Sequence, residues 1–124
     1  MRPIIIIGSY DRVLDLDQVL PKLRSGSCFK FVTLVFQKLD EEILVLAVGD
    51  MSMTHQDIEQ IAEFKLKPCF DLVSLEPAGG LISIKNGKLS FSGSKQIKRF
   101  NSDLLRQVDP KQLSDIFGAE TVNF

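Results

Sequence analysis

The sequence predicts a single α+β domain in which a mixed or mostly antiparallel sheet of about six strands is flanked by two main helices. Short runs rich in Val, Ile, Leu and Phe predict the strands, and one of these runs is apolar at every position. Two segments begin with helix capping residues, and two tight connections predict hairpins. The 124 residues show no internal repeat and no linker, so residues 1–124 are expected to form one domain.

The amino-terminal half is expected to supply three strands. Residues 4–7 (Ile-Ile-Ile-Ile) predict a short buried strand, and residues 11–24 fit either a short helix or an irregular loop. Residues 28–36 and 43–48 predict central strands covered on both faces. The polar residues 37–42 between them are short enough for an antiparallel hairpin.

The clearest helix is expected to begin after Thr54. Thr54 is a suitable N-cap, and Asp57, three residues later, completes a capping box. The helix ends before Pro68, which cannot continue it. The apolar stripe predicted to face the core consists of Ile58, Ile61, Ala62 and Phe64.

The carboxyl-terminal half predicts a hairpin and a second helix. Residues 70–75 form a strand candidate that is closed by a turn at 77–80. Residues 81–85 and 88–92 flank Asn86-Gly87, a dipeptide typical of a type I′ turn. The remaining elements are a short turn after Ser102, a helix that begins at Asp109 and ends at Gly118, and a last strand over 120–124.

Composition excludes several classes of protein. A net charge of −1 argues against nucleic acid or a membrane surface as partner. The longest apolar run near the amino terminus is too short for a signal peptide or a membrane span, so a cytoplasmic protein is expected. Cys28 and Cys69 lack metal-ligand spacing and are predicted to be buried free thiols. With a single histidine, neither a metal site nor a cofactor is expected.

His55 is the first candidate for chemistry, because it falls in the first turn of the predicted helix. Backbone N–H groups there lack intrahelical partners, and together with the positive end of the helix dipole they favour an anion. The same field keeps an imidazole neutral, and a neutral imidazole beside a phosphate acts as a general base or as a nucleophile. The alternative is a polar residue that lies near a helix start without a function.

Two further positions suggest an anion site. Lys30 is the only charged residue within the apolar run 28–36, where it either faces a pocket or extends from a strand end towards solvent. Ser92, Gly93, Ser94 and Lys95 resemble a small anion loop, although their spacing is not that of a nucleotide-binding loop and an ordinary turn fits equally. Basic residues gather over 85–111 and acids at 40–42 and 57–63, a pattern that fits either steering of a phosphorylated partner or a solvated polar surface.

Several of these features occur in the order found in a known family. They are Phe29-Lys30-Phe31-Val32 in an early strand, His55 followed by Asp57-Ile58, Gly79-Gly80 with Ile82-Ser83, and the late strand 88–93 followed by a helix. Over about residues 28–124 the chain resembles the Janus/Ocnus family, the small phosphohistidine phosphatases.

The resemblance implies roles for individual residues. His55 would be the catalytic histidine that activates water, Lys30 a lysine near the phosphate, and Gly93, Ser94 and Lys95 the phosphate loop. The chain departs from the family at Leu81, which replaces an arginine, and in 43–48, where a basic residue is absent. Lys95 stands where the family has a serine, and as a point cation it would supply part of the lost charge.

The expected function is therefore that of a phosphohistidine phosphatase-like protein, which hydrolyses a phosphoryl group without a metal and with His55 as general base. One alternative is a non-catalytic module on the same fold that binds phosphate or a phosphorylated protein. A second alternative is a structural or oligomeric domain. The sequence leaves the oligomeric state open, a homodimer included.

Overall fold

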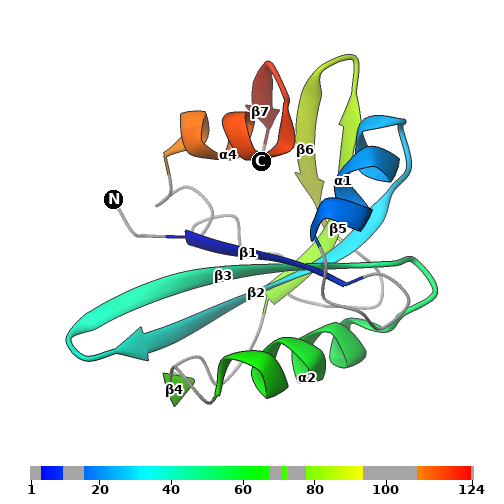
Figure 1. Ribbon diagram of the computed structural model, residues 1–124. Helices are drawn as coiled ribbons and strands as arrows, with labels where there is room; N and C mark the ends of the chain where they lie inside the picture. Colours follow the sequence, from blue (N-terminus) through cyan, green and yellow to red (C-terminus); the bar gives the residue numbers. More distant parts are fainter. Residues whose placement is uncertain (1–3, 10–15, 68–70, 73–77, 94–108, 124) are drawn as a thin grey trace.

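The computed structural model describes residues 4–9, 16–67, 71–72, 78–93 and 109–123. Within these ranges three helices, α1 (Leu16–Arg24), α2 (His55–Leu66) and α4 (Pro110–Phe117), lie around one sheet (Figure 1). The strands of that sheet are β1 (Ile4–Ser9), β2 (Phe29–Lys38), β3 (Glu41–Gly49), β4 (Asp71–Leu72), β5 (Ala78–Lys85), β6 (Lys88–Ser92) and β7 (Thr121–Asn123). The predicted α+β class is confirmed.

The sheet is mixed, as the sequence predicted. Its strand order is β1-β3-β2-β5-β6-β7, and the short β4 pairs with β2 beside this path. β1 runs parallel to β3 and β7 runs parallel to β6, whereas β2–β3, β2–β5 and β5–β6 are antiparallel. Two of the seven described strands, β4 and β7, are no longer than three residues, which leaves five longer strands against the six or so expected.

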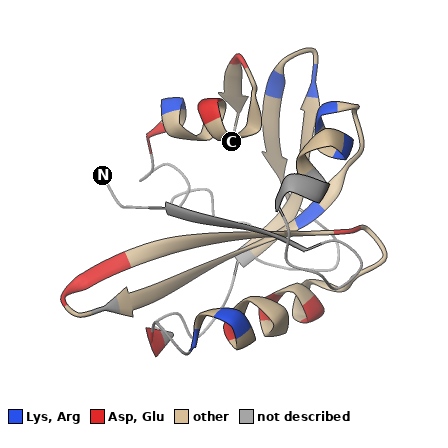
Figure 2. Ribbon diagram, in the orientation of Figure 1, with Lys and Arg blue, Asp and Glu red and all other residues tan. Residues whose placement is uncertain are grey.

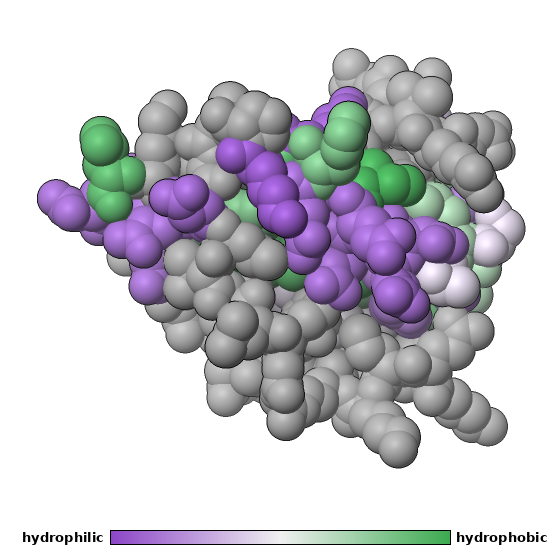
Figure 3. Space-filling view, turned by 90° about the horizontal axis from the view of Figure 1, so that it is seen from below, coloured by the Kyte–Doolittle hydropathy of each residue, from purple (hydrophilic) through white to green (hydrophobic). Residues whose placement is uncertain are grey.

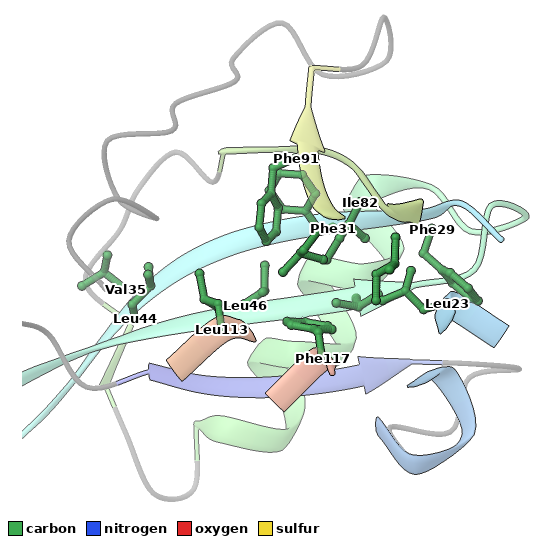
Figure 4. Packing of buried hydrophobic residues seen from close by; sticks show 13 residues of the cluster. Leu23, Phe29, Phe31, Val35, Leu44, Leu46, Ile82, Phe91, Leu113 and Phe117 are labelled. Carbon is green, nitrogen blue, oxygen red and sulfur yellow. The ribbon is translucent and has the colours of Figure 1, made fainter. Parts of the chain in front are cut away.

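The two central strands bury both of their faces. Alternate residues of β2 point to opposite sides, so Phe31 and Val35 face α1 and α4 while Leu34 and Phe36 face α2. On the first side, Phe31 and Phe91 meet edge to face with ring centroids 5.2 Å apart (Figure 4). Because helices cover both sides, the run in β3 can be apolar at every position, as predicted.

The capping box that begins α2 is present as predicted. Asp57 N–H donates to Thr54 Oγ1 at 3.0 Å, and Thr54 N–H donates to Asp57 Oδ2 at 3.2 Å. The buried stripe consists of His55, Ile58, Ala62 and Leu66. The prediction that Phe64 faces the core is wrong, since its side chain is 84% exposed. Two residues correspond to about 200° around a helix, so Phe64 lies opposite its buried neighbours Ala62 and Leu66.

Two local predictions are wrong, and one alternative that the sequence left open is decided. Gly79 and Gly80 belong to strand β5 instead of a turn, and they pair with Val32 and Phe31 of β2. Cys28 is exposed and free, so the prediction of a buried thiol is wrong for this residue, which lies just before the apolar part of β2. Residues 16–24 are helical, which decides between helix and loop for that part of the amino-terminal segment.

Other predictions fall outside the described residues. They concern Cys69, most of the strand predicted over 70–75, and the turn after Ser102. Among the residues that are described, no helix is long and apolar enough to cross a membrane.

Candidate functional site

His55 is held in the interior at the first position of α2. Its side chain is 7% exposed, and Nε2 lies 3.0 Å from the carbonyl oxygen of Gly80 in β5. A carbonyl oxygen can only accept a hydrogen bond, so Nε2 must carry the proton and donate it. In the neutral ring the lone pair therefore belongs to Nδ1.

Nδ1 of His55 is buried and, within the described part of the chain, has no hydrogen-bond partner. Leaving a buried polar atom unpaired lowers the stability of the fold by about 1–3 kcal/mol. A histidine that served only to anchor α2 to β5 would therefore destabilise the protein. The orientation imposed by the Gly80 carbonyl thus leaves one ring nitrogen available to accept a proton or to attack an electrophile.

The start of α2 also offers backbone donors. Of the four N–H groups that a helix start leaves unpaired, the capping box satisfies those of Thr54 and Asp57. The N–H groups of His55 and Gln56 remain, and neither has an acceptor recorded in the described ranges. Together with the positive end of the helix dipole, these two groups favour an anion beside His55.

Lys30 is a buried cation near the same helix start. Its side chain is 5% exposed, and Nζ donates to the carbonyl oxygen of Met53 at 2.7 Å, two residues before His55. Among the described residues Lys30 has no carboxylate partner. Burying an ammonium group costs several kcal/mol unless an opposite charge accompanies it. The Lys30 ammonium therefore provides an electrostatic reason for an anion to bind here.

Gly93, the first residue of the predicted phosphate loop, reaches the same place. A side chain at Gly80 would collide with the carbonyl oxygen of Ser92, and its Cβ would lie 3.2 Å from the Cα of Gly93. The end of β6 thus lies against the residue whose carbonyl holds His55. His55 and Gly93 thus both lie against Gly80, and Lys30 pairs with the next residue, Leu81. Ser94 and Lys95 lie outside the described residues.

Leu81 lies directly beside Lys30. The two residues pair across β2 and β5, and Leu81 also pairs with Ser92 of β6. Side chains of directly paired residues project from the same face of a sheet. A half-buried apolar side chain therefore stands next to the buried ammonium, at the position where the resemblance places an arginine.

Sequence reasoning missed two groups of this site. The carbonyl oxygens of Gly80 and Met53 orient His55 and Lys30, respectively. Both are backbone atoms, and every residue has such an atom, so no residue type signals this role. Of the contacts that hold the start of α2 in place, the sequence predicted the capping box.

A groove of about 700 Å³ lies elsewhere, and residues of α2 that include Ile61 and Phe64 line it together with Ser52 and Met53. Neither His55 nor Lys30 lines it. Viewed from the α2 side, the described surface is mostly hydrophilic with a few hydrophobic areas (Figure 3). Among the described residues no group of His, Cys, Asp and Glu is arranged to hold a metal.

Comparison of the chain with models of known families, with curated proteins and with solved structures found no match.

Proposed function

We propose that the chain is a phosphohistidine phosphatase-like hydrolase whose reaction centres on His55. The observation that carries the proposal is that two buried polar groups at one helix start each lack a partner of a particular kind. They are the buried Nδ1 of His55, which has no donor, and the buried ammonium of Lys30, which has no counter-ion in the described part of the chain. A phosphoryl group with a bound water supplies what both groups lack.

The proposed binding mode uses the positive groups around the helix start. Phosphoryl oxygens accept from the N–H groups of His55 and Gln56 and from Lys30. Ser94 and Lys95, which follow Gly93 in the chain, are proposed to add contacts. Since Nδ1 is buried, local movement around His55 precedes substrate entry.

The proposed reaction transfers the phosphoryl group from a histidine nitrogen to water. The oxygen of the water forms a bond to phosphorus, while Nδ1 of His55 takes one proton from that water. The P–N bond then breaks, and the proton passes to the departing nitrogen. The Gly80 carbonyl keeps the other proton on Nε2, so that the ring presents its lone pair to the water. No metal takes part in this scheme, because Lys30 and the backbone donors stabilise the charge on the oxygens.

Phosphate release from a phosphohistidine-bearing peptide tests the proposal. His55→Ala and Lys30→Met are expected to lower the initial rate by at least about 100-fold, within the range for loss of a general base or of a charge-stabilising group. Lys67→Met is the matched control, because Lys67 is exposed and lies at the far end of α2. Release that is unchanged in a folded His55→Ala protein would contradict the mechanism.

A binding module without turnover is the second candidate, and Leu81 favours it. With leucine beside Lys30, the site has less positive charge than phosphoryl transfer commonly uses. This candidate predicts that inorganic phosphate shifts the NMR signals of His55 and Lys95 although no phosphate is released. If phosphate shifts no specific signal and the protein elutes as a multimer, a structural role is favoured instead.

A further inference from the structure

The hairpin β5–β6 has one buried face and one accessible face. Ile82, Ile84, Leu89 and Phe91 are buried in the cluster that includes residues of α1 and α4. The intervening residues therefore project to the other side of the sheet. They form three cross-strand pairs, namely Leu81 with Ser92, Ser83 with Ser90, and Lys85 with Lys88. We call these six residues the serine–lysine face.

The serine–lysine face is continuous with the candidate site. Lys30 pairs with Leu81, so both side chains project from the same side of the sheet, which is also the side covered by α2. α2 packs mainly against β2 and β3, and it touches β5 where His55 lies 3.0 Å from the carbonyl oxygen of Gly80, next to Leu81. Ser83 and Ser90 are half-buried, whereas Ser92 and both lysines are exposed.

The far end of this face carries an unbalanced positive charge. Lys85 and Lys88 stand directly opposite each other, an arrangement that is destabilising for like charges. Neither lysine has an ion pair in the described ranges. The side chain of Glu120 lies against Gly87 at the turn, but within the described ranges no ion pair joins it to either lysine. Figure 2 shows these basic residues at the end of the β5–β6 hairpin, apart from the acids of α2 and of the β2–β3 hairpin.

We propose that the serine–lysine face docks an acidic segment of the phosphorylated partner protein whose phosphohistidine enters the His55 site. This inference rests on the proposed function and names the partner's chemistry. The serines are small enough for an extended chain to lie over them, and their hydroxyls bond to its backbone. Lys85 and Lys88 then pair with carboxylates of the partner, which removes their mutual repulsion.

The spacing of the face specifies where the acid should lie. From Leu81, beside Lys30, to Lys85 the strand advances about 13 Å, at roughly 3.3 Å per residue. An extended partner therefore places an acidic residue about four positions from its phosphohistidine.

The test compares peptides that carry a stable phosphohistidine analogue. One peptide has Glu four residues from the analogue and the other has Gln there; both are titrated at low salt with fluorescence anisotropy. The wild-type protein is expected to bind the Glu peptide roughly 5-fold more tightly, the effect of one exposed carboxylate that pairs with both Lys85 and Lys88. The double variant Lys85→Gln/Lys88→Gln should lose this preference. Lys67→Gln/Lys111→Gln, which removes the same charge elsewhere, should keep it.

Other outcomes separate this inference from the proposed function. Phosphate release from phosphoramidate, a small substrate that does not reach the lysines, should be equal in the wild type and the double variant. Release without a preference for the Glu peptide overturns the docking inference alone. A preference without release supports docking and contradicts hydrolysis. A third outcome is that the wild type is a dimer, that the double variant is a monomer, and that both peptides bind equally. This outcome overturns the inference, because the face then binds a second copy of the chain.

Discussion

Replacing Lys30 by methionine removes the ammonium group but keeps a side chain of similar length in the same buried place. The variant loses the hydrogen bond from Nζ to Met53, which is a charge-assisted bond of about 1.5–3 kcal/mol. It also avoids the cost of burying an ion, which is several kcal/mol for a side chain that is 5% exposed. The two effects oppose each other, so the free energy of unfolding should stay within about 1 kcal/mol of the wild type or rise by up to about 2 kcal/mol.

Anion binding should respond in the opposite direction. A phosphoryl oxygen about 4 Å from Nζ interacts with it by up to roughly 4 kcal/mol at an effective dielectric constant of 20. A loss of even a third of this energy weakens phosphate affinity by about 10-fold. The same variant is therefore expected to bind phosphate much less well while its stability stays close to that of the wild type or rises, a trade-off typical of binding sites.

Urea unfolding and a phosphate titration followed by NMR measure the two effects on one sample. Lys67→Met, at an exposed position on α2, should change neither quantity by a comparable amount. The reasoning would be refuted if Lys30→Met lowered the free energy of unfolding by more than about 2 kcal/mol and left phosphate affinity intact. In that case Lys30 would serve to hold the Met53 carbonyl and not to attract an anion.

Three other substitutions probe the helix start, the charges of α2 and the apolar residue beside Lys30. Thr54→Ala removes the N-cap acceptor and should lower the free energy of unfolding by about 1 kcal/mol, measured in urea, whereas Ser52→Ala, which leaves the capping box intact, should have little effect. Burial, with the neighbouring Glu63 adding to it, raises the pKa of Glu59, so the folded state holds this proton more tightly and stability falls as pH rises through the raised value. Glu59→Gln should accordingly stabilise the protein by a few tenths of a kcal/mol at pH 7 and not at pH 3, and equal effects at both values would contradict this assignment. Leu81→Arg should strengthen phosphate binding several-fold, because it adds a bidentate donor beside Lys30; an unchanged phosphate titration would place residue 81 away from the anion.

Elements with a short-range signal were predictable from the sequence. Thr54 and Asp57 form the capping box because cap geometry involves only residues three positions apart. The β5–β6 hairpin buries Ile82 and Phe91 because Asn86-Gly87 sets the turn and alternation then sets the faces. In both cases the physical causes, local sterics and side-chain periodicity, act within a few residues.

Predictions failed where local signals were ambiguous. Gly79 and Gly80 suggested a turn, but in the fold they allow β5 to lie close to its neighbours, since a side chain at Gly80 would strike Ser92. Phe64 was predicted to face the core because it is apolar, but it does not belong to the buried stripe of α2. Which residues form that stripe depends on where α2 meets the sheet. The parallel pairing of β1 with β3 has no short-range signal at all.

For His55 the sequence by itself determined the place at the start of a helix, and with it the nearby backbone donors. Only the tertiary structure decided that Nε2 is bound by Gly80, that Nδ1 is left without a partner, and that Lys30 reaches Met53. These contacts join residues 25 and 23 positions apart in the chain. They exist because β5 and β2 pair beside the start of α2, and strand pairing over such distances follows from the packing of the whole core and not from any local pattern.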